Sequence, residues 1–587
     1  MKAKFLTTII IYLLSLPALG IFYFSNIPSA RSVEESIKLF PERKFQIISH
    51  FANKQVGKTF ELKTHRSFSQ VAVAKAYLGI DGDKVSSVLL QENFKPFGKV
   101  GTNFKFIPYV CERKGDYDFA LIHLVQLAYL SQTNNFLSDK AYKKLLFDLL
   151  TAKGNKHHIK FNIGACGTYK DTENHVLMTE TSRYLTNDLL KEYYKKIEEE
   201  LPEEYDNDKN GFHTWIIKHL KEIEDNFFDE YNSKPYQSYA LMPIANLAGF
   251  SKNVGVRNAA QGILDHQSKL FYAQSIHGRR LVPFRRQLVY EQEESLIPGD
   301  GEIARHALLT GQLGFYPGNR EYRLIGYGVH VMFSYAITGI KLNDHLLKKL
   351  INRGDTPFYQ TFNHQTPELY YQSKNFLLSA GGVHVNRLDG GTKLNDGWAM
   401  PTTLMTKENE TFQIADLFRF KGNKHRLKRR NTCVYNNFAC GINFAFPNNF
   451  NKECGIEKEG FQFFDLSTDK CGNHGQVLLI LMTSSCDSYR CKKRGKNVGF
   501  MEVREKSEIS LDALIEKTIQ NNKFTKIKSI KHNTYTTSLG DKIEFQPIPL
   551  KKREWEIVNI NGEYIKRGFD RWQKYHGQLM ELFFSVP

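Results

Sequence analysis

The feature that most constrains the fold of this chain is a change in the spacing of its apolar residues near position 355. Before it, from about 115 to 350, apolar residues recur three and four positions apart, which is the period of an amphipathic helix. After it come short apolar or aromatic runs bounded by Gly, Asn and Asp, which is typical of strands and turns. The change therefore predicts a helical domain followed by a β domain.

The first part predicts helices over 116–130, 138–154, 171–190 with a continuation to 201, 213–231, 239–250 and 256–274. Helices joined by short loops are expected to be antiparallel neighbours, and six or more such hairpins can curl into a ring. We therefore expect an N-terminal (α/α) helical toroid over residues 31–354.

The second part predicts strands in 367–382, 412–422, 431–446, 461–467, 476–484 and 497–505, with one isolated helix at 512–522. Their number and spacing favour a C-terminal antiparallel β-sandwich over residues 355–587, which makes the chain an α+β multidomain protein. The basic segment 421–431 is interpreted as an exposed hairpin loop.

The first 30 residues have the form of a secretory signal: Lys2 and Lys4, an apolar run from Phe5 to Phe24, and small residues ending at Ala30. The run is also long enough to span a bilayer, so an uncleaved membrane anchor stays open as the alternative. Both predict a secreted, periplasmic or cell-surface protein.

The eight cysteines fit export, because disulfides persist in oxidising compartments. A zinc site is the lesser alternative, since no CxxC pair occurs. Two cysteines, Cys111 and Cys166, lie in the first part of the chain. The other six lie close together in the second part: Cys433, Cys440, Cys454, Cys471, Cys486 and Cys491.

The formal net charge of +18 favours acidic partners such as uronate polysaccharides, cell-surface anions or nucleic acid. No helix-turn-helix, zinc-finger or single-strand-binding motif occurs, so nucleic acid is not expected. The chain also lacks a nucleotide loop, an HExxH zinc site, a GxSxG elbow and an EF-hand loop, so no cofactor or metal is predicted.

The predicted helix 171–190 carries more polar residues than packing requires. On a helical wheel they form two separate stripes, so at most one stripe can line a site. One stripe consists of His175, Thr179, Ser182 and Thr186, and the other of Glu173, Glu180 and Asn187, with Tyr184 beside it. A buried inner helix with polar neighbours is the alternative interpretation.

Two further polar clusters follow. The first cluster contains Tyr231, Asn232, Tyr236 and Tyr239, and the second contains His277, Arg279, Arg280, Arg285 and Arg286. The arginines of the second cluster suit bidentate binding of carboxylate or sulfate, although a charged loop paired with nearby acids is an equal alternative.

The pair Asn174-His175 on a predicted toroid helix, the following tyrosines and arginines, and the predicted sandwich together resemble the toroid-plus-sandwich polysaccharide lyases, which are enzymes of the alginate-lyase, heparinase and chondroitin-lyase type. Segments such as "DYDFAL" and "YNSKPYQSY" also resemble large exported bacterial proteins, which implies no activity.

The lyase resemblance implies β-elimination on an acidic polysaccharide. Asn174 would bind the uronate carboxylate, and His175 or a tyrosine would be the general base. A tyrosine would protonate the leaving oxygen, with Tyr236 favoured over Tyr231 and Tyr239. The substrate-binding candidates are Arg279, Arg280, Arg285, Arg286, His277 and Asn232.

Two other functions stay open. A glycoside hydrolase would need two carboxyl groups, which Glu173 with Glu230, or Asp300 with Glu302, could supply. A non-catalytic glycan-binding surface protein would need only the basic and aromatic residues.

Overall fold

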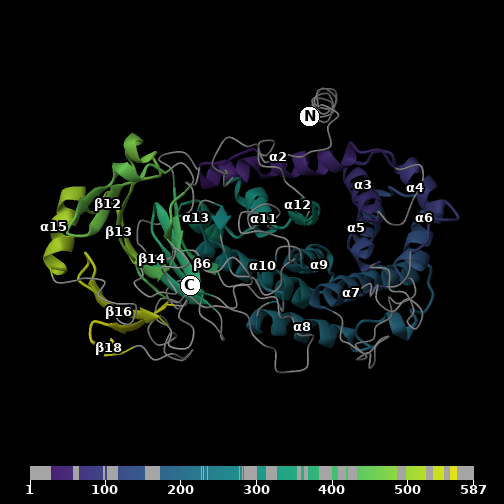
Figure 1. Ribbon diagram of the computed structural model, residues 1–587. Coiled ribbons are helices and arrows are strands. Elements are labelled where there is room, and N and C mark those ends of the chain that lie inside the picture. Colours follow the sequence, from purple (N-terminus) through teal and green to yellow (C-terminus); the bar gives the residue numbers. More distant parts are fainter. Residues whose placement is uncertain are drawn as a thin grey trace, which may run out of the picture.

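Helices occupy the N-terminal half of the chain and antiparallel sheets the C-terminal half, as the change of period predicts (Figure 1). The structure is a computed structural model. It describes residues 28–56, 65–96, 100–101, 117–151, 172–226, 228, 230–233, 236–276, 278–280, 282, 301–312, 327–352, 358–362, 368–381, 400–407, 418–420, 433–442, 444–447, 450–485, 497–523, 533–547 and 555–564.

Several helices begin directly after a side chain that caps them. The side chains of Ser32, Ser138, Asn253 and Asn343 each accept a hydrogen bond from the first turn that follows them. The helices are α2 (Val33–Ala52), α3 (His65–Leu78), α4 (Gly82–Leu90), α5 (Asp118–Asn134), α6 (Asp139–Lys144), α7 (Glu173–Lys196), α8 (Phe212–Asn226), α9 (Tyr236–Phe250), α10 (Val254–Gln274), α11 (Gly301–Thr310), α12 (Tyr327–Thr338) and α13 (Asp344–Ile351).

The helices pack as a row of neighbours. α3 packs on α5, α5 on α7, α7 on α9, and α9 on both α10 and α12. α2 runs along the upper edge in Figure 1 and contacts α3, α11 and α12. A single apolar core joins these helices.

The first sheet has the order β10-β7-β6-β5-β4-β3 and the second β11-β12-β13-β14-β9-β8. The first contains β3 (Phe358–Phe362), β4 (Glu368–Gln372), β5 (Phe376–Gly381), β6 (Met400–Thr406), β7 (Phe418–Phe420) and β10 (Phe444–Ala445). The second contains β8 (Val434–Tyr435), β9 (Phe438–Ile442), β11 (Ile456–Lys458), β12 (Phe461–Asp465), β13 (Val477–Ser485) and β14 (Asn497–Glu505).

A third sheet and a helix complete the C-terminal half. The sheet has the order β15-β16-β17-β18. Its strands are β15 (Asn533–Thr536), β16 (Lys542–Pro547), β17 (Trp555–Ile560) and β18 (Glu563–Tyr564), and the helix is α15 (Leu511–Asn521).

The first sheet buries both of its faces. Leu378 and Leu404 are paired across β5 and β6 and belong to the core shared with the second sheet. Their neighbours Leu377 and Met405 are also paired but belong to the helical core. Because successive side chains alternate between the faces of a strand, the sheet separates the two cores and contributes to each.

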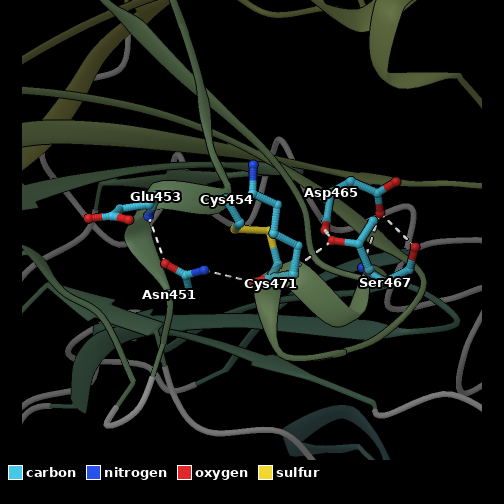
Figure 2. Close-up of a disulfide and its surroundings, with 8 residues drawn as sticks. Asn451, Glu453, Cys454, Asp465, Ser467 and Cys471 are labelled. Carbon is cyan, nitrogen blue, oxygen red and sulfur yellow. Dashed lines mark hydrogen bonds between the residues drawn. A yellow bond between two sulfur atoms is a disulfide. The ribbon is translucent and has the colours of Figure 1, made fainter.

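Two disulfides link cysteines of the C-terminal half, Cys433 with Cys440 and Cys454 with Cys471. The second joins two short turns whose polar side chains bond locally (Figure 2): Asn451 Nδ2 donates to the Lys470 carbonyl, and Ser467 Oγ donates to Asp465. The other four cysteines and the basic segment 421–431 lie outside the described residues.

In the part of the chain that the structure describes, no helix is both long and apolar enough to cross a membrane. The apolar N-terminal run lies outside that part.

We expect the double substitution Cys454→Ser with Cys471→Ser to lower the free energy of unfolding of the β half by about 3 kcal/mol. The bridge closes a loop of 17 residues, and opening it lets the unfolded chain gain that much conformational freedom. Urea denaturation measures the loss. Wild-type protein under full reduction should lose at least as much, and a double variant as stable as the oxidised protein would contradict the expectation.

We expect the carboxyl group of Asp188, on α7, to make the free energy of unfolding depend on pH. Burial raises the pKa of this carboxyl from 3.8 to about 6. Between those values the folded state holds the proton more tightly than the unfolded state, so Asp188 contributes a loss of stability as pH rises through this window. Asp188→Asn should remove that contribution. Unfolding curves at pH 4 and pH 7 measure it, and an unchanged difference between the two pH values would refute this.

Candidate functional site

Several helices share one end, where their N-termini meet. Phe119, in the first turn of α5, makes edge-on ring contacts with His175 near the start of α7 and Tyr239 near the start of α9, at centroid distances of 5.3 and 4.6 Å. Gly301 begins α11 so close to α9 that a Cβ there would lie 2.2 Å from Ser238 Oγ. We call this region the polar end. Helix N-termini carry partial positive charge and unpaired N–H groups, so the polar end favours anions.

At the polar end His175 is held by a buried carboxylate. Its Nδ1 lies 2.5 Å from Asp118 Oδ2, and Asp118 Oδ1 accepts the backbone N–H of Gly101 at 3.1 Å. A carboxylate at Nδ1 keeps the proton on that nitrogen and makes Nε2 the basic one. The arrangement suits His175 to general-base chemistry.

Asn174, the neighbour of His175, is fully buried. Its Oδ1 accepts a hydrogen bond from Thr172 Oγ1 at 2.6 Å, but among the residues that the structure describes its Nδ2 has no hydrogen-bond partner. Leaving a buried donor unpaired costs about 1–3 kcal/mol. An amide kept in this state beside an oriented imidazole is a candidate for binding an oxygen of a ligand.

Three other predicted residues, Tyr231, Asn232 and Arg280, come together between the helices and the first sheet. Gln274 is at the centre: its Nε2 donates to the Tyr231 hydroxyl at 2.5 Å and to Glu368 Oε2 at 3.3 Å. Arg280 Nη1 donates to Gln274 Oε1 at 2.9 Å and to Asn232 Oδ1 at 3.0 Å. All five residues are buried, so the group joins the helical half to strand β4.

The surroundings of Tyr231 fix its protonation state. Burial, and then the charge of Glu368, raise the pKa of this phenol well above its usual value. Tyr231 is therefore a neutral phenol at neutral pH and cannot serve as a phenolate base.

The other tyrosines and basic residues differ in exposure. Tyr239 is buried against Phe119, whereas Tyr236, the first residue of α9, is half-buried and the most accessible of the three tyrosines. Arg279 is buried in strand β2 (Arg279–Arg280), which pairs with β1 (Ser275–Ile276). His277, Arg285 and Arg286 lie outside the described residues.

The polar end and the Tyr231 group adjoin each other. The backbone N–H of Glu230 points to Glu173 Oε2 at 3.5 Å, so the start of α7 lies beside the turn that carries Tyr231 and Asn232. This contact also brings together the chain segments of Glu173 and Glu230, one of the two acid pairs considered for hydrolysis.

In the other pair, Asp300 with Glu302, Glu302 forms an ion pair with Arg305 at 2.6 Å, and Asp300 lies outside the described residues.

The two polar stripes of α7 have separate partners. His175 contacts α5 through Asp118, whereas the Tyr184 hydroxyl lies 3.1 Å from His213 Nδ1 on α8. The prediction that Tyr184 and His175 face different sides is confirmed. Glu180 forms an ion pair with Arg183 on the same helix at 3.3 Å.

Sequence reasoning missed Asp118. The residue lies in the first turn of the predicted helix 116–130, but nothing in the pattern connects it to His175, which lies 57 positions later. Among the described residues, no group of three or more His, Cys, Asp or Glu side chains is placed to hold a metal ion.

Comparison with known proteins gives no relative: no family model and no curated protein matches this chain.

Proposed function

We propose that this protein is an exported lyase that cleaves an acidic, uronate-containing polysaccharide by β-elimination. The observation that carries the proposal is the buried Nδ2 of Asn174, which has no partner among the described residues and lies next to His175, whose imidazole is oriented by Asp118. In the same proposal the helices form an (α/α) toroid and the first two sheets form a β-sandwich.

β-Elimination needs a base and a site for negative charge. Nε2 of His175 takes the proton from C5 of the uronate, the C4–O bond breaks, and a double bond forms between C4 and C5. Negative charge that develops on the carboxylate is stabilised by the N–H group of Asn174 and by the positive ends of the helices. Asp118 stabilises the imidazolium that His175 becomes.

The leaving oxygen must receive a proton. Tyr236 is the best donor among the three candidates because it is the most accessible. The Tyr231 hydroxyl already binds Gln274 in the buried group between the helices and β4, which we call the junction. Arg279 and Arg280 then contribute positive charge near the site, with Arg280 also holding the junction together.

Export and an acidic substrate have independent support. Two disulfides favour an oxidising compartment. The net charge of +18 favours a polyanionic substrate.

The test is a degradation screen on polymannuronate, polygalacturonate, hyaluronan, chondroitin sulfate and heparin. A lyase generates unsaturated uronate ends, which absorb in the ultraviolet. New reducing ends without that absorbance would replace the proposal by hydrolysis. Salt-sensitive binding without any cleavage would replace it by a non-catalytic glycan-binding protein.

Glycoside hydrolysis is the second candidate, favoured by the contact between Glu173 and Glu230. Such enzymes use two carboxyl groups on either side of the bond. Glu173 and Glu230 are both buried, and one would act as the acid and the other as the base or nucleophile.

Asn174→Leu should separate function from stability. We expect kcat/KM to fall about 100-fold, because the donor to the substrate carboxylate is lost. The free energy of unfolding should stay within about 1 kcal/mol or rise, since the variant removes an unpaired buried donor. Steady-state kinetics and urea denaturation measure the two effects.

Asn246→Leu is the matched control, because both ends of its buried amide are bonded, to Gln126 and to the Ile122 carbonyl. It should lose about 2 kcal/mol of stability. If Asn174→Leu is destabilised as much as Asn246→Leu, the amide of Asn174 is structural.

A further inference from the structure

A chain of hydrogen-bonded side chains runs from the polar end into the helical core. His330 Nδ1 lies 2.5 Å from Gln70 Nε2, which lies 3.1 Å from His123 Nε2. His123 Nδ1 lies 3.0 Å from Gln126 Oε1. Gln126 Nε2 donates to Asn246 Oδ1 at 2.7 Å, so the chain joins α12, α3, α5 and α9.

The direction of every bond is set at the inner end. Asn246 Nδ2 donates to the Ile122 carbonyl at 2.9 Å, and a carbonyl can only accept. Asn246 Oδ1 therefore accepts from Gln126 Nε2, and Gln126 Oε1 accepts from His123 Nδ1. With its proton on Nδ1, a neutral His123 presents Nε2 as an acceptor to Gln70.

Gln70 transmits this order to His330. Its Nε2 carries two hydrogens, one for His123 Nε2 and one for His330 Nδ1. His330 Nδ1 must then be an acceptor, which places the ring proton of His330 on Nε2. A proton on His123 Nε2 or on His330 Nδ1 would place an N–H donor against the NH₂ donor of Gln70. Both rings are therefore held in their neutral form.

His330 lies at the polar end. A Cβ on Gly301 would contact both Ser238, near the start of α9, and Val331, the residue after His330. The start of α12 therefore meets the starts of α9 and α11. Gln70, His123, Gln126 and Asn246 are buried, whereas His330 is half-buried.

We propose that His330 is a further ligand-binding residue of the polar end, a neutral donor whose Nε2–H bonds to an oxygen of an acidic sugar unit. Gln70 is its positioning residue. The ligand role rests on the proposed function, while the fixed ring form does not. A neutral donor suits a region where several helix N-termini already disfavour another positive charge.

The ring form is tested first, on the full chain labelled with ¹⁵N-histidine at pH 7. Spectra of the His330→Ala and His123→Gln variants assign the two rings. We expect His330 protonated on Nε2 and His123 on Nδ1. Gln70→Glu replaces the shared donor by an acceptor and should convert at least one ring to imidazolium. The opposite ring forms, or unchanged spectra in Gln70→Glu, would overturn the proposal.

The ligand role is tested by calorimetric titration with tetrasaccharides of polymannuronate, polygalacturonate and hyaluronan, in an Asp118→Asn background that prevents turnover. His330→Ala should bind the recognised tetrasaccharide about 10-fold more weakly. His345→Ala removes an exposed histidine of α13 and should leave the affinity unchanged.

The two kinds of failure are distinguishable. Equal affinity of His330→Ala and the parent protein overturns the role of His330 and leaves the proposed function standing. If the parent binds none of these tetrasaccharides, and the screen shows no cleavage, the proposed function fails and the ligand role of His330 fails with it.

Discussion

Asp118→Asn should reduce kcat about 1,000-fold or more while KM changes little. The reason is a forced inversion of the His175 ring. The N–H of Gly101 needs an acceptor at the position of Oδ1, so the amide NH₂ of the new side chain must face His175 Nδ1. That nitrogen becomes an acceptor, the ring proton moves to Nε2, and His175 can no longer take a proton from the substrate.

Asp188→Asn is the matched control. It makes the same change at a half-buried acid of α7 that accepts hydrogen bonds from Asn207 and from the backbone N–H of Lys252. It should keep full kcat. Circular dichroism of both variants checks that the helices are intact. If Asp118→Asn retains kcat within a few-fold, His175 is not the base, and a tyrosine or Glu230 takes its place.

How far the sequence predicts the site follows from what a helical period can report. The wheel of residues 171–190 separates His175 from Tyr184, and the two side chains do contact different helices. A period reports only the face on which a residue lies. It says nothing of the partner, so Asp118 and the His330–Gln70–His123 chain, whose contacts span 57, 260 and 53 positions, could not be found from it.

For the fold too, the sequence pattern predicts some elements but not their surroundings. The strand pattern of 367–382 corresponds to the hairpin of β4 and β5, but it does not reveal that both faces of that sheet are buried. Glu368 and Gln372 point at the helices and bond to Gln274 and the Ser275 carbonyl, so polar residues that suggest a solvated face are in fact internal. The sheet β15–β18 was not predicted either.

The longest omission is α2. No helix is predicted before residue 116, and α2 contains a proline, Pro41, within its length. A proline inside a helix removes one backbone hydrogen bond, and local pattern alone then disfavours the helix. Contacts with α3, α11 and α12 supply what the local sequence lacks.

Arg43, on α2, bonds directly to α11, and Arg43→Met should lower the free energy of unfolding by about 3–5 kcal/mol. Arg43 is fully buried, and its donors reach the Leu308 carbonyl at 2.7 Å, the Leu309 carbonyl at 3.2 Å and the Ser36 carbonyl at 2.8 Å. Leu308 and Leu309 lie in the last turn of α11, where carbonyls lack helical partners and a positive charge is favourable.

The charge on Arg43 persists in the core. Burial lowers the pKa of its guanidinium to about 10, so the group is still protonated at pH 7. Methionine fills a similar volume but removes the side-chain donor from three carbonyls, two of which lie in the last turn of α11, and that loss exceeds the gain from removing a buried charge. Urea denaturation at pH 7 measures the difference. Lys38→Met removes the same charge from an exposed position of α2 and should change stability by less than about 0.5 kcal/mol. A loss below about 1 kcal/mol in Arg43→Met would mean that apolar packing alone holds α2 on the other helices.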